Sequence, residues 1–215
     1  MKRLAVGVLV ASALTAAAPA IAQAPTLTLA ISRVAGGPQG TTTFVRFGEL
    51  VRVSGAISTG AANRPVDLLI SPYGGTMQTI RLTTDSSGAF RYSHRPQIRT
   101  SYMARSGGQA SSQEVYAHVR PKVGLRVLNA RLRRFRVTMQ AIPERVSHVV
   151  LFQRRVTPSR WRTVKRVRVA TDNLTAVFTA RLPRGVQRVR IVVPQTPGYL
   201  TGFSAFVRVT IPSAG

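Results

Sequence analysis

The chain has 215 residues, no cysteine, and 31 basic against 6 acidic side chains, which gives a formal net charge of +25. Without cysteine there are no disulfides, so stability must come from hydrophobic cores, and a zinc site would need a coincidence of fold. So few carboxylates also leave little material for acid–base catalysis.

The first 22 residues have the organisation of a signal peptide. Lys2 and Arg3 form a positive start, residues 4–18 are apolar and alanine-rich, and residues 20–22 have the small-x-small form of a signal peptidase site. We expect cleavage after Ala22 and a secreted or cell-envelope protein, with an uncleaved membrane anchor as the alternative. No later segment has the run of about 20 apolar residues that a transmembrane helix needs.

Residues 25–120 consist of short alternating segments separated by turn residues, which predicts strands and almost no helix. The turn signals are the glycine-rich segment 36–40, the segment 72–75 and the segment 85–88. The predicted strands are 26–31, 50–57, 65–71, 76–83, 89–94, 100–105 and 112–119. Their spacing is typical of a β-sandwich.

The second half repeats this organisation, with predicted strands at 123–128, 132–139, 148–154, 161–169, 175–182, 186–193 and 205–211. An offset of 87 residues places Asp85 on Asp172 and Pro96 on Pro183 with the order of the strands preserved, which indicates an internal duplication. We therefore expect two domains, at residues 23–119 and 120–215. The join at residues 119–122 is too short to be a flexible tether.

The residues that mark strands and turns in the first half are 50–55, 65–68, Thr83-Thr84-Asp85 with Gly88-Ala89-Phe90, Tyr102 with Ala104, and the closing strand from Ser111 to Pro121; in the second half they are 150–154, Trp161, and Tyr199-Leu200 before Ser204. With these features the chain resembles the immunoglobulin-like or fibronectin-III-like repeats of secreted surface proteins of the actinobacterial type. The second half departs from the pattern at residues 172–175, where the turn lacks a glycine. The resemblance implies two tandem immunoglobulin-like β-sandwich domains in an extracellular setting. Such modules are spacers, adhesins or wall binders, so function does not transfer with the fold.

No constellation of residues predicts catalysis or a cofactor. His94, His118 and His148 lie far apart and none has a second ligand at metal spacing, and His118 is expected to point outward into solvent. Asp85 and Asp172 are typical turn formers. The chain has no Gly-x-Ser-x-Gly elbow, phosphate loop or Ser-His-Asp order. We expect a protein that is not an enzyme and that needs no metal or cofactor.

The charge is distributed unevenly. Residues 23–118 carry 9 arginines against 4 acids, for a net charge of +5, whereas residues 119–215 carry 20 lysines and arginines against Glu144 and Asp172, for a net charge of +18. This asymmetry indicates a polyanionic partner or surface. A codon preference for arginine is the alternative; it accounts for 28 arginines against 3 lysines but not for the scarcity of acids in one half.

Strand alternation in the second half predicts faces lined by arginine. The residues expected to point outward are Arg134, Arg136, Arg162, Arg166, Arg168, Arg188 and Arg190. Trp161, the only tryptophan, is expected on the core side with Val167 and Val169. Lys165 also falls on the core side unless a β-bulge shifts the register.

We expect the arginines of strands 161–169 and 186–193 in one sheet and those of strand 132–139 in the other, so that charge surrounds the domain. This favours diffuse, salt-sensitive binding to an anionic wall polymer, an acidic polysaccharide or an anionic membrane surface, without specific reading of nucleic acid. The first domain would be a spacer. The alternatives are an inert basic surface, and an adhesive or protein-binding module that acts through edge-strand or loop contacts.

Overall fold

Alternation of apolar and polar residues in short segments makes this chain a succession of β-strands. In Arg134–Gln140 the side chains of Phe135, Val137 and Met139 are buried and the residues between them are exposed. The computed structural model describes residues 25–107, 110–141, 148–170 and 173–213, so the predicted signal peptide at 1–22 lies outside it. The described residues form strands and no helix, and hence no helix that could cross a membrane.

The first sandwich is built from two sheets, which we name sheets A and B. Its strands are β1 (Leu27–Arg33), β2 (Thr42–Arg46), β3 (Val51–Ile57), β4 (Pro65–Pro72), β5 (Gln78–Thr83), β6 (Ala89–His94), β7 (Thr100–Ser106), β8 (Ala110–Ser111) and β9 (Val115–Arg120). Sheet A has the order β1-β3-β6, and sheet B has the order β2-β9-β7-β4-β5 with β8 paired to β7. All described pairings are antiparallel except that of β2 with β9, which is parallel.

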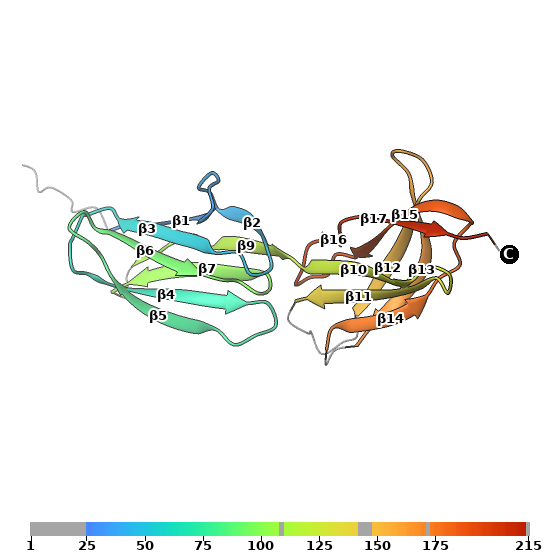
Figure 1. The fold of residues 1–215 in the computed structure, drawn as a ribbon. Helices are drawn as coiled ribbons and strands as arrows, with labels where there is room; N and C mark the ends of the chain where they lie inside the picture. Colours follow the sequence, from blue (N-terminus) through green and yellow to red (C-terminus); the bar gives the residue numbers. More distant parts are fainter. Residues whose placement is uncertain (1–24, 108–109, 142–147, 171–172, 214–215) are drawn as a thin grey trace, which may run out of the picture.

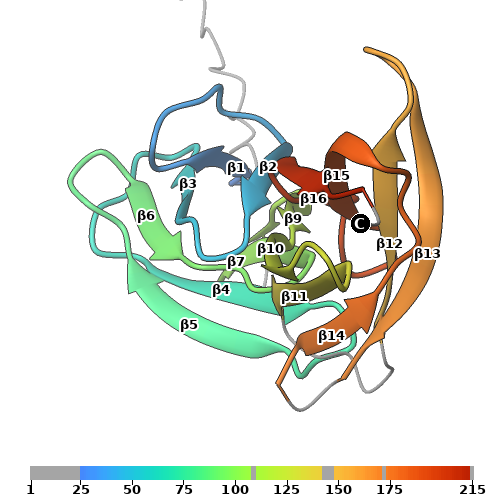
Figure 2. The same ribbon diagram turned by 45° about the vertical axis from the view of Figure 1, so that its right-hand side comes forward.

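The second sandwich is built from sheets C and D and lies end to end with the first (Figure 1). Its strands are β10 (Lys122–Asn129), β11 (Arg134–Gln140), β12 (His148–Arg155), β13 (Trp161–Val169), β14 (Thr175–Thr179), β15 (Gly185–Val193), β16 (Gly202–Phe203) and β17 (Val207–Ile211). Sheet C has the order β10-β11-β14, and sheet D has the order β13-β12-β15-β16 with β17 also paired to β15. In Figure 2, β12 and β13 form a long hairpin along one side of this sandwich.

The two sandwiches repeat one topology. Sheet C matches sheet A strand for strand, and β17, β15, β12 and β13 of sheet D match β9, β7, β4 and β5 of sheet B. A buried serine marks the same place in both: the Ala104 N–H donates to the Ser112 Oγ at 2.9 Å, and the Ile191 N–H donates to the Ser204 Oγ at 2.9 Å. Ala104 and Ile191 are 87 residues apart, which is the offset that the sequence predicts.

The all-β prediction and the tandem immunoglobulin-like sandwich are confirmed, and every segment predicted as a strand contains one. Sequence reasoning missed β2, β8 and β16. β8 and β16 have only two residues each, too short for an alternating pattern. β2 follows the glycine-rich loop and is held by its parallel pairing with β9, a partner more than 70 positions away that local periodicity does not reveal.

Each sandwich buries aromatic rings at its centre. Tyr102 is fully buried in the first. In the second, Phe135 of sheet C, Phe152 of sheet D and Phe178 of sheet C form a triangle with ring centroids 4.8 to 5.7 Å apart. This cluster joins the two sheets and fixes which face of β12 points inward.

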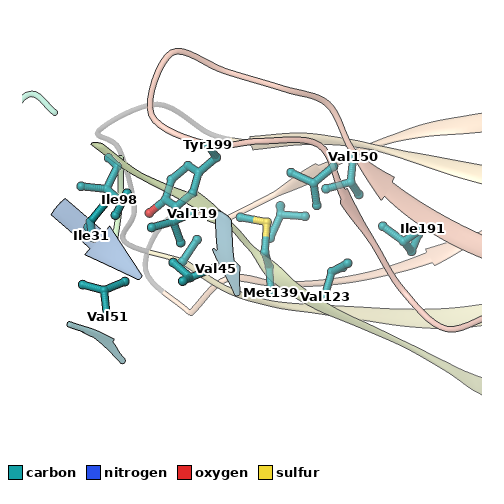
Figure 3. Close-up of a cluster of buried hydrophobic side chains, with 14 of the residues drawn as sticks. Ile31, Val45, Val51, Ile98, Val119, Val123, Met139, Val150, Ile191 and Tyr199 are labelled. Atoms are coloured by element: carbon teal, nitrogen blue, oxygen red, sulfur yellow. The ribbon is translucent and has the colours of Figure 1, made fainter. Parts of the chain in front are cut away.

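The junction between the sandwiches is packed rather than open. Only Pro121 separates β9 from β10, and Tyr199, from the loop after β15, is buried at the boundary. Figure 3 shows Tyr199 close to Ile98 and Val119 of the first sandwich, on the same side of the cluster as Val45. Among the described residues, two backbone hydrogen bonds cross the boundary: the Arg99 N–H donates to the Gly198 carbonyl at 2.9 Å, and the Leu200 N–H donates to the Val119 carbonyl at 3.0 Å.

Gly202 provides a test of this junction. A Cβ at Gly202 would lie 3.0 Å from the Pro121 carbonyl oxygen and 2.9 Å from its Cγ, so the connection between the sandwiches would have to shift. We expect Gly202→Ala to lower the free energy of unfolding by about 1–3 kcal/mol, the usual cost of overpacking. Urea unfolding measures it, with Gly40→Ala as the matched control because a Cβ there meets nothing within 4 Å. Equal stability of the two variants would contradict a tight junction.

Candidate functional site

A β-bulge in the β12–β13 hairpin decides which side chains face solvent on sheet D. Phe152 pairs with Lys165, but the next residue of β12, Gln153, pairs with Thr163, so Val164 is the additional residue of β13. Val164 packs against the core. Residues before the bulge therefore point to the opposite side from the one that simple alternation predicts.

Lys165 is accordingly on the core side of β13, at the open edge of the sandwich. Its Nζ donates a hydrogen bond to the Thr179 carbonyl oxygen of β14, at 2.9 Å, and so ties the edge of sheet D to sheet C. The sequence places Lys165 on the core side unless a bulge shifts the register; a bulge is present, but it lies before Lys165 and leaves this side chain on the core side.

The prediction that Trp161 shares the core face with Val167 and Val169 is wrong. Trp161 lies on the outer face of sheet D, half-buried, with the Arg190 guanidinium 4.2 Å from its ring centroid. The cause is the bulge, because it inverts the side of every residue of β13 that precedes it.

Arg190 is held between two aromatic rings. Its guanidinium carbon lies 4.2 Å from the Trp161 centroid and 5.1 Å from the Phe203 centroid, and its Nε donates to the Gln153 Oε1 at 3.0 Å. Burial lowers the pKa of Arg190 below its ordinary value, although a guanidinium remains charged at neutral pH. The side chain is thus a positive charge with a fixed orientation rather than a mobile one.

Arg188, two residues earlier on β15, contacts one aromatic ring. Its guanidinium carbon lies 5.6 Å from the Phe206 ring centroid, and it is paired across the sheet with Arg208 of β17. Phe203 and Phe206 remain 47% and 56% exposed. A hollow of about 310 Å³ lies beside Arg188, between the β12–β13 turn and Val186.

These residues make up one surface, which we call the arginine–aromatic face. It is the outer face of sheet D and comprises Trp161, Arg166, Arg168, Arg188, Arg190, Phe203, Phe206 and Arg208. None of the described strands of sheet D contains an acidic residue. Among the described residues, none of its arginines forms an ion pair.

The seven arginines expected on outward faces are not brought together into one site. Arg134 and Arg136 lie on sheet C and are exposed there, whereas Arg166, Arg168, Arg188 and Arg190 belong to the arginine–aromatic face. Arg162 is exposed but pairs with Arg154, whose other cross-strand partner is the buried Val189, so it lies on the inward side of the hairpin. Sequence reasoning missed Phe203 and Phe206, which lie in or beside the short strand β16.

The histidines do not form a metal site within the described part of the chain, where no group of three His, Cys, Asp or Glu residues gathers. His94 Nδ1 lies 2.8 Å from the Tyr102 hydroxyl inside the first sandwich, and burial lowers the pKa of His94. His118 points outward, as expected, but it is half-buried beneath Phe44, with ring centroids 5.5 Å apart, rather than fully solvated.

No protein-family model matches the chain, and no curated protein matches it. Among solved structures it is similar to a tetra-tandem repeat from the extending region of a large adhesion protein, with 15% identity, a TM-score of 0.42, and coverage of 87% of this chain and 50% of that one. It is similar to a two-domain fibronectin type III segment of chicken tenascin, with 12% identity, a TM-score of 0.43, and coverage of 75% and 92%. A third is the FN1–FN3 segment of chicken CNTN1, with 11% identity, a TM-score of 0.28, and coverage of 80% and 63%. The chain thus spans half the length of the first, and these likenesses concern the fold alone.

The sole tryptophan reports on the geometry of Arg190. Removal of the guanidinium in Arg190→Ala exposes one face of the indole to water, so we expect the fluorescence emission maximum to move to longer wavelength. Arg134→Ala on sheet C is the control and should leave the spectrum unchanged. An Arg190→Ala spectrum identical to that of the wild type would show that the indole is not covered by this side chain.

The half-buried His94 of the first sandwich predicts a pH dependence of stability. Because the pKa of folded His94 lies below the ordinary value near 6.5, the unfolded chain takes up a proton first as the pH falls below about 6.5, and stability decreases toward the folded pKa. We expect His94→Gln to reduce the loss of stability between pH 7.0 and 5.5 in urea unfolding. The reference protein and the His94→Gln variant should both carry His118→Gln, because burial also lowers the pKa of His118. A pH dependence that persists in full in the His94 variant would contradict this assignment.

Proposed function

We propose that this protein is a non-enzymatic extracellular or cell-envelope module whose second sandwich binds anionic polymers through its arginines. The observation that carries the proposal is the set of outward arginines on both sheets of that sandwich, without ion-pair partners among the described residues. The first sandwich acts as a spacer. The proposal includes a signal peptide at residues 1–22 and domains at 23–119 and 120–215.

Electrostatic repulsion within the second sandwich supports this proposal. Three pairs of arginines stand directly opposite each other on neighbouring strands: Arg126 with Arg136, Arg154 with Arg162, and Arg188 with Arg208. Like charges in this position are destabilising. Arginines two apart along one strand, about 6.7 Å, add a repulsion of roughly 0.6 kcal/mol per pair in water. A polyanion that neutralises these charges relieves the repulsion in the bound state.

Charged residues have different cross-strand neighbours in the first sandwich. In sheet B, Asp67 stands opposite Arg81 on one side and opposite Arg105 on the other, so these two arginines have an acidic neighbour, whereas Arg46 and Arg120 stand opposite each other. In the second sandwich the two acids, Glu144 and Asp172, lie outside the described residues and in none of the described strands. The contrast favours the second sandwich as the part that contacts an anionic partner.

The placement of the charge also supports low specificity. Arginines on two opposite faces cannot contact one rigid ligand together, whereas a flexible polymer or an extended surface can meet either face. Binding of this kind depends on counterion release and weakens with added salt. The binding partners that fit are an anionic wall polymer, an acidic polysaccharide and an anionic membrane surface.

An adhesive function through strand pairing is the second candidate. β5 is an edge strand of sheet B that pairs only with β4 among the described residues, so its outer edge offers free backbone donors and acceptors. β13, the edge of sheet D, is less suited because it carries a bulge and four cationic side chains. Salt-insensitive capture of one protein partner would favour this function.

Matched charge removal tests the leading proposal. One variant replaces Arg134, Arg136, Arg166 and Arg168 with glutamine, and the control replaces Arg33, Arg52, Arg91 and Arg95; all eight are exposed and both variants lose four charges. On a heparin column, we expect the first variant to elute at clearly lower salt, with about a tenfold loss of affinity at 0.15 M salt, and the control to lose less than about threefold. Equal shifts would show that only net charge matters, and absence of wild-type retention at physiological salt would refute polyanion binding.

A further inference from the structure

We propose that the arginine–aromatic face is a binding site for an acidic polysaccharide, with Arg190 holding an acid group and the neighbouring aromatic rings contacting the sugar. This inference rests on the proposed function and makes it specific, because it assigns a ligand class to one face of one sheet. The remaining outward arginines, such as Arg134 and Arg136, would then supply the non-specific part of binding.

The orientation of Arg190 is the first argument. Trp161 and Phe203 flank the guanidinium, and its Nε–H donates to the Gln153 Oε1. The Gln153 Nε2 in turn donates to the Thr163 Oγ1 at 3.4 Å. The four N–H groups on the two Nη atoms have no hydrogen-bond partner among the described residues. They present a planar donor edge of the kind that binds a carboxylate or sulfate through two parallel hydrogen bonds.

Pre-organisation distinguishes Arg190 from the other arginines of the surface. Arg166 and Arg168 are exposed and contact no aromatic ring among the described residues, so a ligand that binds them must restrict long, mobile side chains at an entropic cost. Arg190 is already restricted by two rings and one amide, so most of that cost is met on folding. An acid group at Arg190 is therefore bound more favourably than one at Arg166 or Arg168.

The exposed aromatic rings indicate what carries the acid group. Phe203 and Phe206 keep about half of their surface in contact with solvent, directly beside the two guanidinium groups of Arg190 and Arg188. A ligand that fits must combine acidic groups with apolar faces that can cover these rings. Pyranose rings that bear carboxylate or sulfate have this combination, whereas an inorganic polyphosphate has the charge without the apolar face.

The layout of the surface favours a chain over a flat membrane. Arg190 and Trp161 are both half-buried, while Phe203 on the other side of the guanidinium is 47% exposed, so the donor edge is recessed beside Phe203. A narrow polymer can reach a recessed group that a bilayer surface does not reach. The second arginine–aromatic pair, Arg188 with Phe206, lies two residues along β15, about 6.7 Å away, and the hollow beside Arg188 continues the same line.

The only tryptophan of the chain makes the test direct, because Trp161 belongs to the site. The protein used is residues 23–215, both sandwiches without the predicted signal peptide. It is titrated with polygalacturonate, with polyphosphate matched for charge, and with uncharged dextran. We expect a saturable change in tryptophan emission with polygalacturonate only, although polyphosphate also binds. Equal emission changes with polyphosphate would overturn the proposal.

Two variants separate this site from general charge. Arg190→Lys keeps the charge but removes the planar donor edge, and Phe206→Ala removes an exposed ring that the fold does not bury. We expect each to weaken polygalacturonate binding roughly tenfold and polyphosphate binding less than about twofold, whereas Arg136→Lys on sheet C changes neither. Unchanged polygalacturonate affinity in both site variants would refute this inference while leaving the proposed function intact; absence of binding to every polyanion would refute both.

Other occupants are distinguished in the same assay. An oligothymidylate that produces the same saturable emission change with equal or higher affinity would assign the face to single-stranded nucleic acid, whose bases stack on aromatic rings. Vesicles rich in phosphatidylglycerol that shift the emission more strongly than polygalacturonate would assign it to a membrane. Either result would overturn the polysaccharide assignment.

Discussion

Burial of alternate side chains between two sheets is the interaction on which this structure depends. The chain has no cysteine, and its strands are held mainly by apolar packing and backbone pairing. The side-chain period of two then fixes the surface as well, because each residue that follows a buried one must face outward. Because Phe135, Val137 and Met139 point into the core, the side chains of Arg134 and Arg136 point outward. The arginine faces are therefore a geometric consequence of the core, given arginine at the intervening positions.

One additional residue, Val164 of β13, changes locally which side chains face outward. The bulge at Val164 brings Trp161 from the expected core side to the outer face, where it meets Arg190 from β15 and, beyond it, Phe203 from β16. The sheet thereby gains a fixed guanidinium between two rings in place of a mobile one. The same bulge twists the edge of sheet D and blunts it against strand pairing, so one irregularity both protects the edge and builds the surface.

Much of the fold could be predicted from sequence because the relevant signals are local. Alternation and turn residues located fourteen strands, and the 87-residue offset found the duplication that relates Ala104 to Ile191. What could not be predicted depends on distant partners. The bulge follows from how β13 meets β12, and the junction from Tyr199 reaching Ile98 and Val119. The fixed orientation of Arg190 depends on residues from four separate strands, β12, β13, β15 and β16. None of these leaves a pattern within a window of ten residues.

The two repeats show how one topology carries two different surfaces. Topology is set by inward residues, which both halves keep apolar: Tyr102 and Ala104 of β7 correspond to Val189 and Ile191 of β15, and all four are fully buried. The outward residues are free to differ, so Ser101 and Met103 correspond to Arg188 and Arg190. Accumulating arginine there costs stability through opposed pairs such as Arg188 and Arg208, yet it does not disturb the core. A ligand that binds only the folded state offsets this cost by mass action. At the junction, Tyr199 and two backbone hydrogen bonds hold the charged repeat against its less charged neighbour.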